Sequence, residues 1–140
     1  MSQTITDQIW NRAAQEGGGD SPTTGDHALA SILLLHGLAM NGGLHHAIEC
    51  LAPDELADAI EGFAYFGFDG ITVWLRAASS DPVLKEWTDE TEVAALYRYA
   101  EFIPDDDSLV TRFEAVYQRR NSEFAPMPKT AITKCDQNWS

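Results

Sequence analysis

The chain is short of positive charge and of long apolar runs. Its 140 residues include 9 Lys and Arg against 22 Asp and Glu, a formal net charge of −13. Such a body repels nucleic acid and anionic membranes, so we expect neither as a direct partner. No run of 18 apolar residues occurs, so the sequence predicts no membrane-spanning helix. The acidity favours a basic protein surface as partner, although solubility alone also accounts for it.

Cysteine is scarce, with only Cys50 and Cys135, far apart in the sequence. Residues 1–16 carry charges and lack the apolar stretch of a secretory signal. We therefore expect a cytoplasmic protein with both thiols reduced. A chain of this length with 44% hydrophobic residues can bury one core without disulfides or metal.

The chemical motifs of common enzyme classes are also missing. The sequence has no Gly-rich phosphate loop, no dinucleotide-binding pattern, no nucleophile elbow and no H-E-x-x-H pair. We therefore expect no catalytic residues and no cofactor.

Apolar residues recur at helical spacing along most of the chain, and no pair of strands with hairpin chemistry is present. The pattern predicts an all-α fold, a single compact domain of about six or seven helices with a flexible C-terminal tail. By residues, we expect an N-terminal helix in 1–16, a linker in 17–25, the main domain in 26–124, and an extended or disordered tail in 125–140. Oligomeric state, monomer or dimer, stays open.

Residues 27–40 are apolar on nearly every side, which predicts a central, buried helix with Asp26 as its N-cap. Pro53 suits the first position of another helix. Thr88 or Asp89 is expected to cap a helix over 90–103, and Asp107 or Ser108 the last helix. For the helix over 90–103 the predicted inner stripe is Val93, Leu96, Tyr97 and Ala100.

The segment "NGGLHHAIEC" raises the question of a metal or catalytic site. His45 and Glu49 are four residues apart, as are His46 and Cys50, so each pair shares a helix face and is able to supply two metal ligands. No further spacing completes four ligands, and no third group orients a Cys–His pair, so we expect neither metal nor catalysis. His36, alone on an apolar stripe, is expected to be a hydrogen-bonded core residue.

Acidic residues form rows that are candidates for partner binding. Asp54, Asp58 and Glu61, followed by Tyr65, share one face of the helix over 53–67, opposite its apolar stripe. Carboxylates four residues apart rise about 6 Å along a helix, of the same order as phosphate spacing along a nucleic-acid strand. An ordinary solvated face is the alternative. The remaining candidate partner-binding residues are Asp89, Glu90, Glu92, Asp105, Asp106 and Asp107.

Asn41, Gly42 and Gly43, followed by Leu44, end one apolar helix and begin another, and Tyr117, Asn121 and Phe124 form a Tyr-x-x-x-Asn-x-x-Phe pattern. With these features, which span about residues 28–124, the chain resembles a family of small acidic all-helical bacterial proteins typified by a DNA mimic that binds a helix-turn-helix transcription regulator. The resemblance implies an all-helical fold in which Asn41, Gly42 and Gly43 are structural.

The resemblance also implies a non-enzymatic protein that binds a basic, DNA-binding partner, either a regulator or a nucleoid protein, and blocks it as a DNA mimic. Some relatives look like immunity proteins of toxin systems. An immunity protein that neutralises a cognate toxin is therefore the alternative function. A metal protein or enzyme centred on His45, His46, Glu49 and Cys50 is the third hypothesis.

Overall fold

The computed structural model describes residues 4–78 and 88–126, which form seven α-helices and one 3₁₀ turn and contain no strand. The helices are α1 (Ile5–Glu16), α2 (Thr24–Gly42), α3 (Leu44–Cys50), α4 (Pro53–Tyr65), α5 (Asp69–Ala78), α7 (Asp89–Phe102) and α8 (Asp106–Arg120), and the 3₁₀ turn is η1 (Asn121–Glu123). The predicted all-α fold is confirmed. Residues 127–140 of the predicted tail, including Cys135, lie outside the described residues. No helix in the described ranges is both long and apolar enough to cross a membrane.

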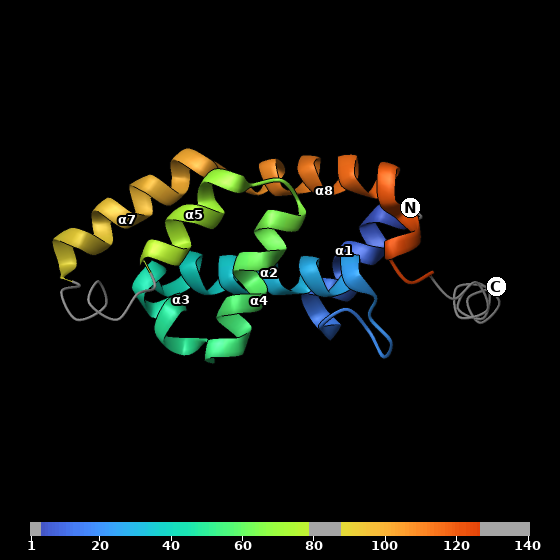
Figure 1. Ribbon diagram of the computed structural model, residues 1–140, viewed down its shortest axis with the longest axis horizontal. Coiled ribbons are helices and arrows are strands. Elements are labelled where there is room, and N and C mark those ends of the chain that lie inside the picture. Colours follow the sequence, from blue (N-terminus) through green and yellow to red (C-terminus); the bar gives the residue numbers. More distant parts are fainter. Residues whose placement is uncertain (1–3, 79–87, 127–140) are drawn as a thin grey trace, which may run out of the picture.

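Helix α2 forms the centre of the fold, with α4 crossing it, α8 along one edge and α1 at one end (Figure 1). Its residues Leu29, Ile32 and Leu35 are fully or almost fully buried. Helix α4 crosses closely at Gly62, where a Cβ would collide with the carbonyl oxygen of Ala28. The apolar residues of α2 are therefore buried on the sides of the helix that face its neighbours.

An aromatic cluster joins the two ends of the described chain. The ring of Phe113 on α8 lies 5.8 Å from that of Trp10, 6.4 Å from that of Phe66 and 5.6 Å from that of Phe124. Tyr117 packs on Phe124 at 5.4 Å. The closing Tyr and Phe of the pattern noted in the sequence thus belong to the core.

A buried carboxylate, Asp26, fastens three segments together. It accepts hydrogen bonds from the Arg12 guanidinium at 2.8 Å, from the Thr23 backbone N–H at 3.1 Å and from the Ala125 N–H at 2.7 Å. Arg12 also donates to the Ala125 carbonyl at 2.8 Å. We call these contacts the Asp26 clasp. The prediction that Asp26 is the N-cap of this helix is wrong, because α2 begins at Thr24 and its N-cap is Thr23.

The corner between α2 and α3 turns at Gly43, whose φ of 98° favours glycine. Asn41 and Gly42 belong to the last turn of α2. A Cβ at Gly43 would also collide with the carboxylate of Glu92 on α7. Glycine here provides both the backbone conformation and the space for this acid.

Two further helix starts were predicted from local sequence. Pro53 is the first residue of α4, and Thr88 caps α7 by accepting the N–H of Thr91 at 3.3 Å, so both predictions are confirmed. The cap predicted for the last helix is wrong, because Asp105 accepts the Ser108 N–H at 3.0 Å and α8 starts at Asp106.

The predicted inner stripe of α7 is wrong at Val93, Tyr97 and Ala100, which are exposed, while Leu96 is partly buried and packs against the core as predicted. Val93 is 53% exposed and Tyr97 73% exposed, while Ala95 and Tyr99 are buried. The side chain that decides the orientation is Tyr99, because its hydroxyl bonds to His36 in the core. Tertiary hydrogen bonding thus overrides a stripe assigned from apolar spacing alone.

Candidate partner-binding surface

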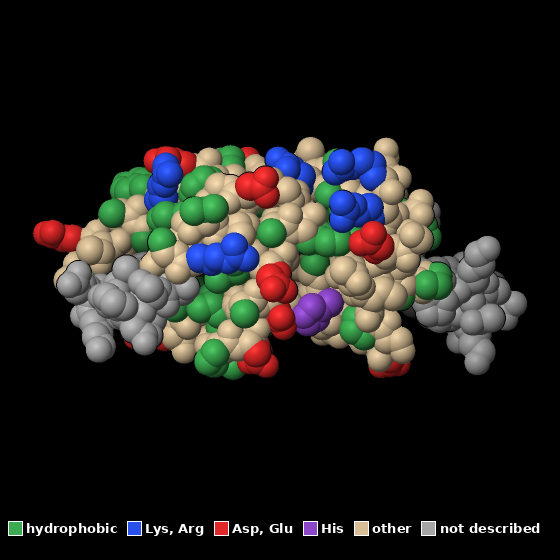
Figure 2. All heavy atoms as spheres, viewed as in Figure 1, with side chains coloured by type: hydrophobic (Ala, Val, Ile, Leu, Met, Phe, Trp, Pro, Cys, Tyr) green, Lys and Arg blue, Asp and Glu red, His purple; other side chains and the backbone are tan. Residues whose placement is uncertain are grey.

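The predicted acidic row lies on α4 and is partly exposed. Asp54 and Glu61 are exposed, while Asp58 is half-buried. Figure 2 shows acidic side chains gathered over α4, whereas Lys and Arg side chains lie along the edge formed by α8 and over the region of α5 and α7. This face of α4 therefore carries negative charge outward. The Arg ion pairs in the described part of the chain, Arg12–Asp26 and Arg98–Glu101, do not involve its acids.

Asp58 has a partner from the neighbouring helix. Its Oδ2 lies 3.1 Å from His27 Nε2, and both side chains are about half exposed. A pair so exposed contributes little to stability. The contact ties the start of α2 to α4 and leaves the Asp58 carboxylate accessible at the surface.

Tyr65 does not continue the acidic row outward. Its hydroxyl donates to Glu123 Oε1 at 2.8 Å, and the Arg120 guanidinium lies 5.4 Å from its ring centre. Burial and, next, the Glu123 carboxylate raise the pKa of Tyr65 to about 12. Tyr65 thus joins α4 to Glu123 in the turn after α8, and the Arg120 guanidinium covers the Tyr65 ring.

At the start of α7, one of three predicted acids has a structural role. Asp89 and Glu90 are exposed, but Glu92 accepts the backbone N–H of His45 at 3.1 and 3.3 Å through its two oxygens. That N–H belongs to the first turn of α3, where a helix has unpaired donors and favours negative charge. Glu92 therefore anchors α3.

At the start of α8, Asp105 is the N-cap and Asp106 contacts the core, so only Asp107 is left without a hydrogen bond to the described residues. These acids and those at the start of α7 lie at opposite ends of α7 (Figure 1). A helix of 14 residues is about 21 Å long. The structure therefore places these two clusters of candidate partner-binding residues far apart from each other.

His36 is buried, and its two ring nitrogens bond to different helices. Nε2 lies 2.8 Å from Asp106 Oδ1, and Nδ1 lies 2.8 Å from the Tyr99 hydroxyl. Because a carboxylate only accepts, Nε2–H donates to Asp106, and in the neutral ring Nδ1 accepts from Tyr99. Burial, and next the charge of Asp106, raise the pKa of Tyr99. The expectation of a hydrogen-bonded core histidine is confirmed.

The histidine-rich turn forms two pairs rather than one cluster. His45 Nε2 lies 3.1 Å from Glu49 Oε1, and Cys50 Sγ lies 3.5 Å from His46 Nδ1. Among the residues that the structure describes, no group of three or more His, Cys, Asp or Glu is placed to hold a metal ion.

A groove along α2 went unrecognised in the sequence, which predicted this helix to be buried. The groove has a volume of about 510 Å³ and is bordered by α1 and α4. Leu34, on its floor, is 45% exposed, and Gly37 opens directly into it. The small residues Ala30 and Gly37, seven apart, were the signal in the sequence.

This surface combines carboxylates on α4 with an apolar groove on α2. Its side chains are suited to binding, since acids offer charge and hydrogen-bond acceptors and the groove offers apolar area. Comparison with protein-family models, with curated proteins and with solved structures finds no match for this chain.

Proposed function

We propose that this chain is a non-enzymatic protein that binds a basic protein partner through the acidic face of α4, acting as a DNA mimic towards a DNA-binding regulator or nucleoid protein. The observation that carries the proposal is the outward row of Asp54, Asp58 and Glu61, in which Asp58 pairs with His27 and none of the three forms an ion pair with a described Lys or Arg. Asp54 Oδ1 accepts the Glu55 N–H at 3.0 Å and Asp58 pairs with His27, but these carboxylates and that of Glu61 remain accessible to solvent. Accessible acids on a chain of charge −13 attract a basic surface.

Mimicry is supported by the spacing of these carboxylates. Asp54 and Asp58 are four residues apart on a straight helical segment, which places them about 6 Å apart along the axis. A protein that binds DNA through Lys and Arg would meet negative charges at a spacing of the order of that of phosphates. DNA should therefore compete with this chain for the partner.

The apolar groove beside the acids favours a second candidate, an immunity protein that neutralises a basic toxin. Leu34 and Leu38 line the groove, and a DNA surface has no such feature. A toxin inhibited in this way would bind with a lower sensitivity to salt, because apolar burial is not screened. Duplex DNA would not compete with it unless the toxin itself binds DNA.

The test is affinity capture from a lysate of the source cells across a salt gradient, with bound proteins identified by mass. We expect a basic DNA-binding protein at low salt, its loss at high salt, and its displacement by duplex DNA. The double variant Asp54→Lys/Glu61→Lys should weaken capture at least about tenfold, because like charges then face each other.

The matched control is Asp89→Lys/Glu90→Lys, which changes the net charge by the same amount at the start of α7. This variant should capture the partner within about twofold of the unchanged protein. Recovery of no basic protein at low salt would contradict the proposed function. Equal capture by the α4 variant and the unchanged protein would show that α4 is not the binding face.

A further inference from the structure

The helix that the sequence predicts to be wholly buried has one side that the described chain leaves partly open. The stripe comprises Ala30, Leu34, Gly37, Leu38 and Asn41, which recur at helical spacing along α2. A helix that is apolar on all sides normally has every side covered. The open stripe therefore indicates a surface that another molecule covers.

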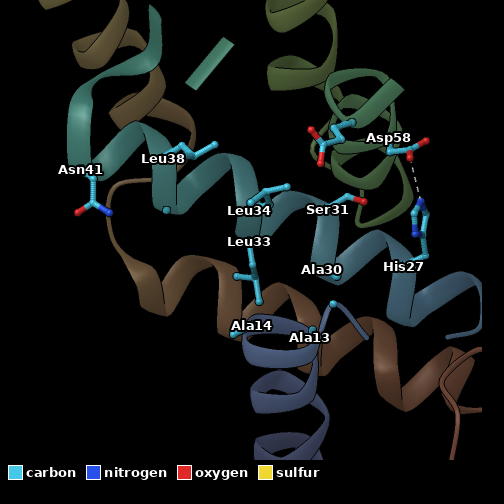
Figure 3. Close-up of a pocket in the computed structure, with 13 residues that line it drawn as sticks. Ala13, Ala14, His27, Ala30, Ser31, Leu33, Leu34, Leu38, Asn41 and Asp58 are labelled. Carbon is cyan, nitrogen blue, oxygen red and sulfur yellow. Dashed lines mark ion pairs between the residues drawn. The ribbon is translucent and has the colours of Figure 1, made fainter. Parts of the chain in front are cut away.

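The groove has two unlike walls (Figure 3). On one side lie Ala13 and Ala14 of α1, towards which Leu33 points. On the other side lie Glu55 and Asp58 of α4. One wall is thus small and apolar, and the other is acidic.

The dimensions of the groove suit a helix. From Ala30 to Asn41 the floor extends over twelve residues, or about 16 Å along the helix axis, which equals the length of three turns of an occupying helix. A Cβ built at Gly37 meets no atom within 4 Å. Small residues in the floor and wall let a helix approach closely and insert apolar side chains at i, i+4 and i+7.

Charge selects the occupant. Glu55 and Asp58 border the groove, and no Lys or Arg of the described chain lines it. His27 also lines it and pairs with Asp58 at 3.1 Å, which leaves the Glu55 carboxylate without a basic partner there (Figure 3). A second copy of the chain, packed symmetrically, would place these acids against their own counterparts, at a cost from like-charge repulsion. A helix with apolar residues on one face and Lys or Arg beside them satisfies both walls.

We infer that the α2 groove binds an amphipathic, basic α-helix of the partner protein, with apolar side chains over Leu34 and Gly37 and positive charges against Glu55 and Asp58. This inference rests on the proposed function and specifies which part of the basic partner is held. The acids of α4 would then act as the rim of an apolar site as well as a charged row.

The test uses a synthetic helical peptide with Leu at i, i+4 and i+7 flanked by Lys, labelled with a fluorophore and titrated with the full chain. The variant Gly37→Leu fills the groove and should weaken binding at least about tenfold. Gly37→Ala is the matched control and should bind within about twofold. Both variants should unfold at no lower temperature than the original, because the site is open and glycine is a poor helix former.

The acidic wall is tested with Glu55→Gln/Asp58→Asn, which keeps hydrogen-bond acceptors and removes charge. This variant should weaken peptide binding at low salt and flatten its salt dependence. A peptide with Glu in place of Lys should not bind. Equal binding by the Glu peptide would overturn the basic occupant.

Three outcomes would contradict the inference that the groove binds a basic helix of the partner. Gly37→Leu that binds the peptide as tightly as the original places the peptide elsewhere. The groove is also not the partner's binding site if Gly37→Leu leaves capture of the basic partner unchanged while Asp54→Lys/Glu61→Lys abolishes that capture. This second result leaves the proposed function standing. A dimer in sedimentation analysis that Gly37→Leu dissociates would identify a second copy as the occupant. Failure of the proposed function has its own signature, unchanged capture by the α4 variant.

Discussion

The acids of α4 and the acids at the starts of α7 and α8 look alike in the sequence but differ in the structure. Glu61 on α4 is exposed and bonds to nothing in the described chain, and Asp54 is exposed although its Oδ1 accepts the neighbouring Glu55 N–H at 3.0 Å. Glu92 instead holds the first turn of α3, and Asp106 holds His36. Counting acids therefore overstates the binding surface, since a carboxylate that satisfies a backbone donor or a buried histidine is committed to the fold.

Asp26, Glu92 and Asp106 form what we call the committed group, the acids that bond to other parts of the fold. Asp26 is the most buried of them, and its loss should have the largest effect on stability. Asp26→Ala leaves the Arg12 guanidinium buried without its counter-charge and should lower the free energy of unfolding by about 3–5 kcal/mol. Urea unfolding followed by circular dichroism measures it. Asp20→Ala, at an exposed turn, is the control and should change stability by less than about 0.5 kcal/mol. Equal effects of the two would show that the clasp does not stabilise the fold.

Glu92→Ala should have the next largest effect. It removes the acceptor for the His45 N–H at the start of α3 and should cost about 1–2 kcal/mol, the usual range for a lost N-terminal cap. Glu90→Ala is well matched, because both acids lie in the first turn of α7 and lose the same interaction with its dipole. Hydrogen exchange of the α3 amides should increase in the first variant alone. Protection that is unchanged would remove Glu92 from the committed group.

Tyr65 lies at the boundary of the acidic row, and its ionisation should be visible in alkaline solution. Its folded pKa of about 12 lies above its ordinary value of 10.0, so its contribution to stability is complete below pH 10 and is lost as pH rises through about 12. Tyr65→Phe should cost about 0.5–1.5 kcal/mol at neutral pH. The difference in stability between the two proteins should disappear at high pH. A difference that is independent of pH would exclude the Glu123 hydrogen bond as its cause.

Glu61→Gln should have the smallest effect on stability, within about 0.5 kcal/mol, because the side chain is exposed and bonds to nothing in the described chain. The same change should lower the salt dependence of partner binding, measured as the slope of affinity against ionic strength. Asp89→Asn removes the same charge elsewhere and should leave that slope unchanged. A destabilisation above about 1 kcal/mol would move Glu61 into the committed group.

Local patterns in the sequence predicted the features that neighbouring residues determine. Pro53 and Thr88 start helices because the chemistry of a helix start is local. His36 was predicted as a bonded core residue, since a polar group on an apolar stripe requires a partner. Its partner Tyr99 lies 63 residues away in the sequence, so local patterns were unable to identify it.

The misses have a common physical reason, which is competition from tertiary contacts. Val93 and Tyr97 form an apolar pair at i, i+4, yet α7 rotates them outward because Tyr99 reaches His36. Glu92 looked like one more surface acid, and only the fold brings it to the start of α3. The groove arises in the same way, because no periodicity shows how far α1 and α4 extend over α2.

The Asp26 clasp has a consequence for the order of folding. Two of its bonds join residues 99 and 113 positions apart in the chain, whereas α2 contacts α3 and α4, the helices that follow it directly in the sequence. During synthesis the local helices are free to pack early, but the clasp waits until residue 125 has left the ribosome. Until then Asp26 and Arg12 lack a backbone partner in Ala125. Ala125 therefore completes the bonding of Arg12 and Asp26, and a chain arrested before that residue lacks the part of the clasp that joins α1 and α2 to the segment after α8.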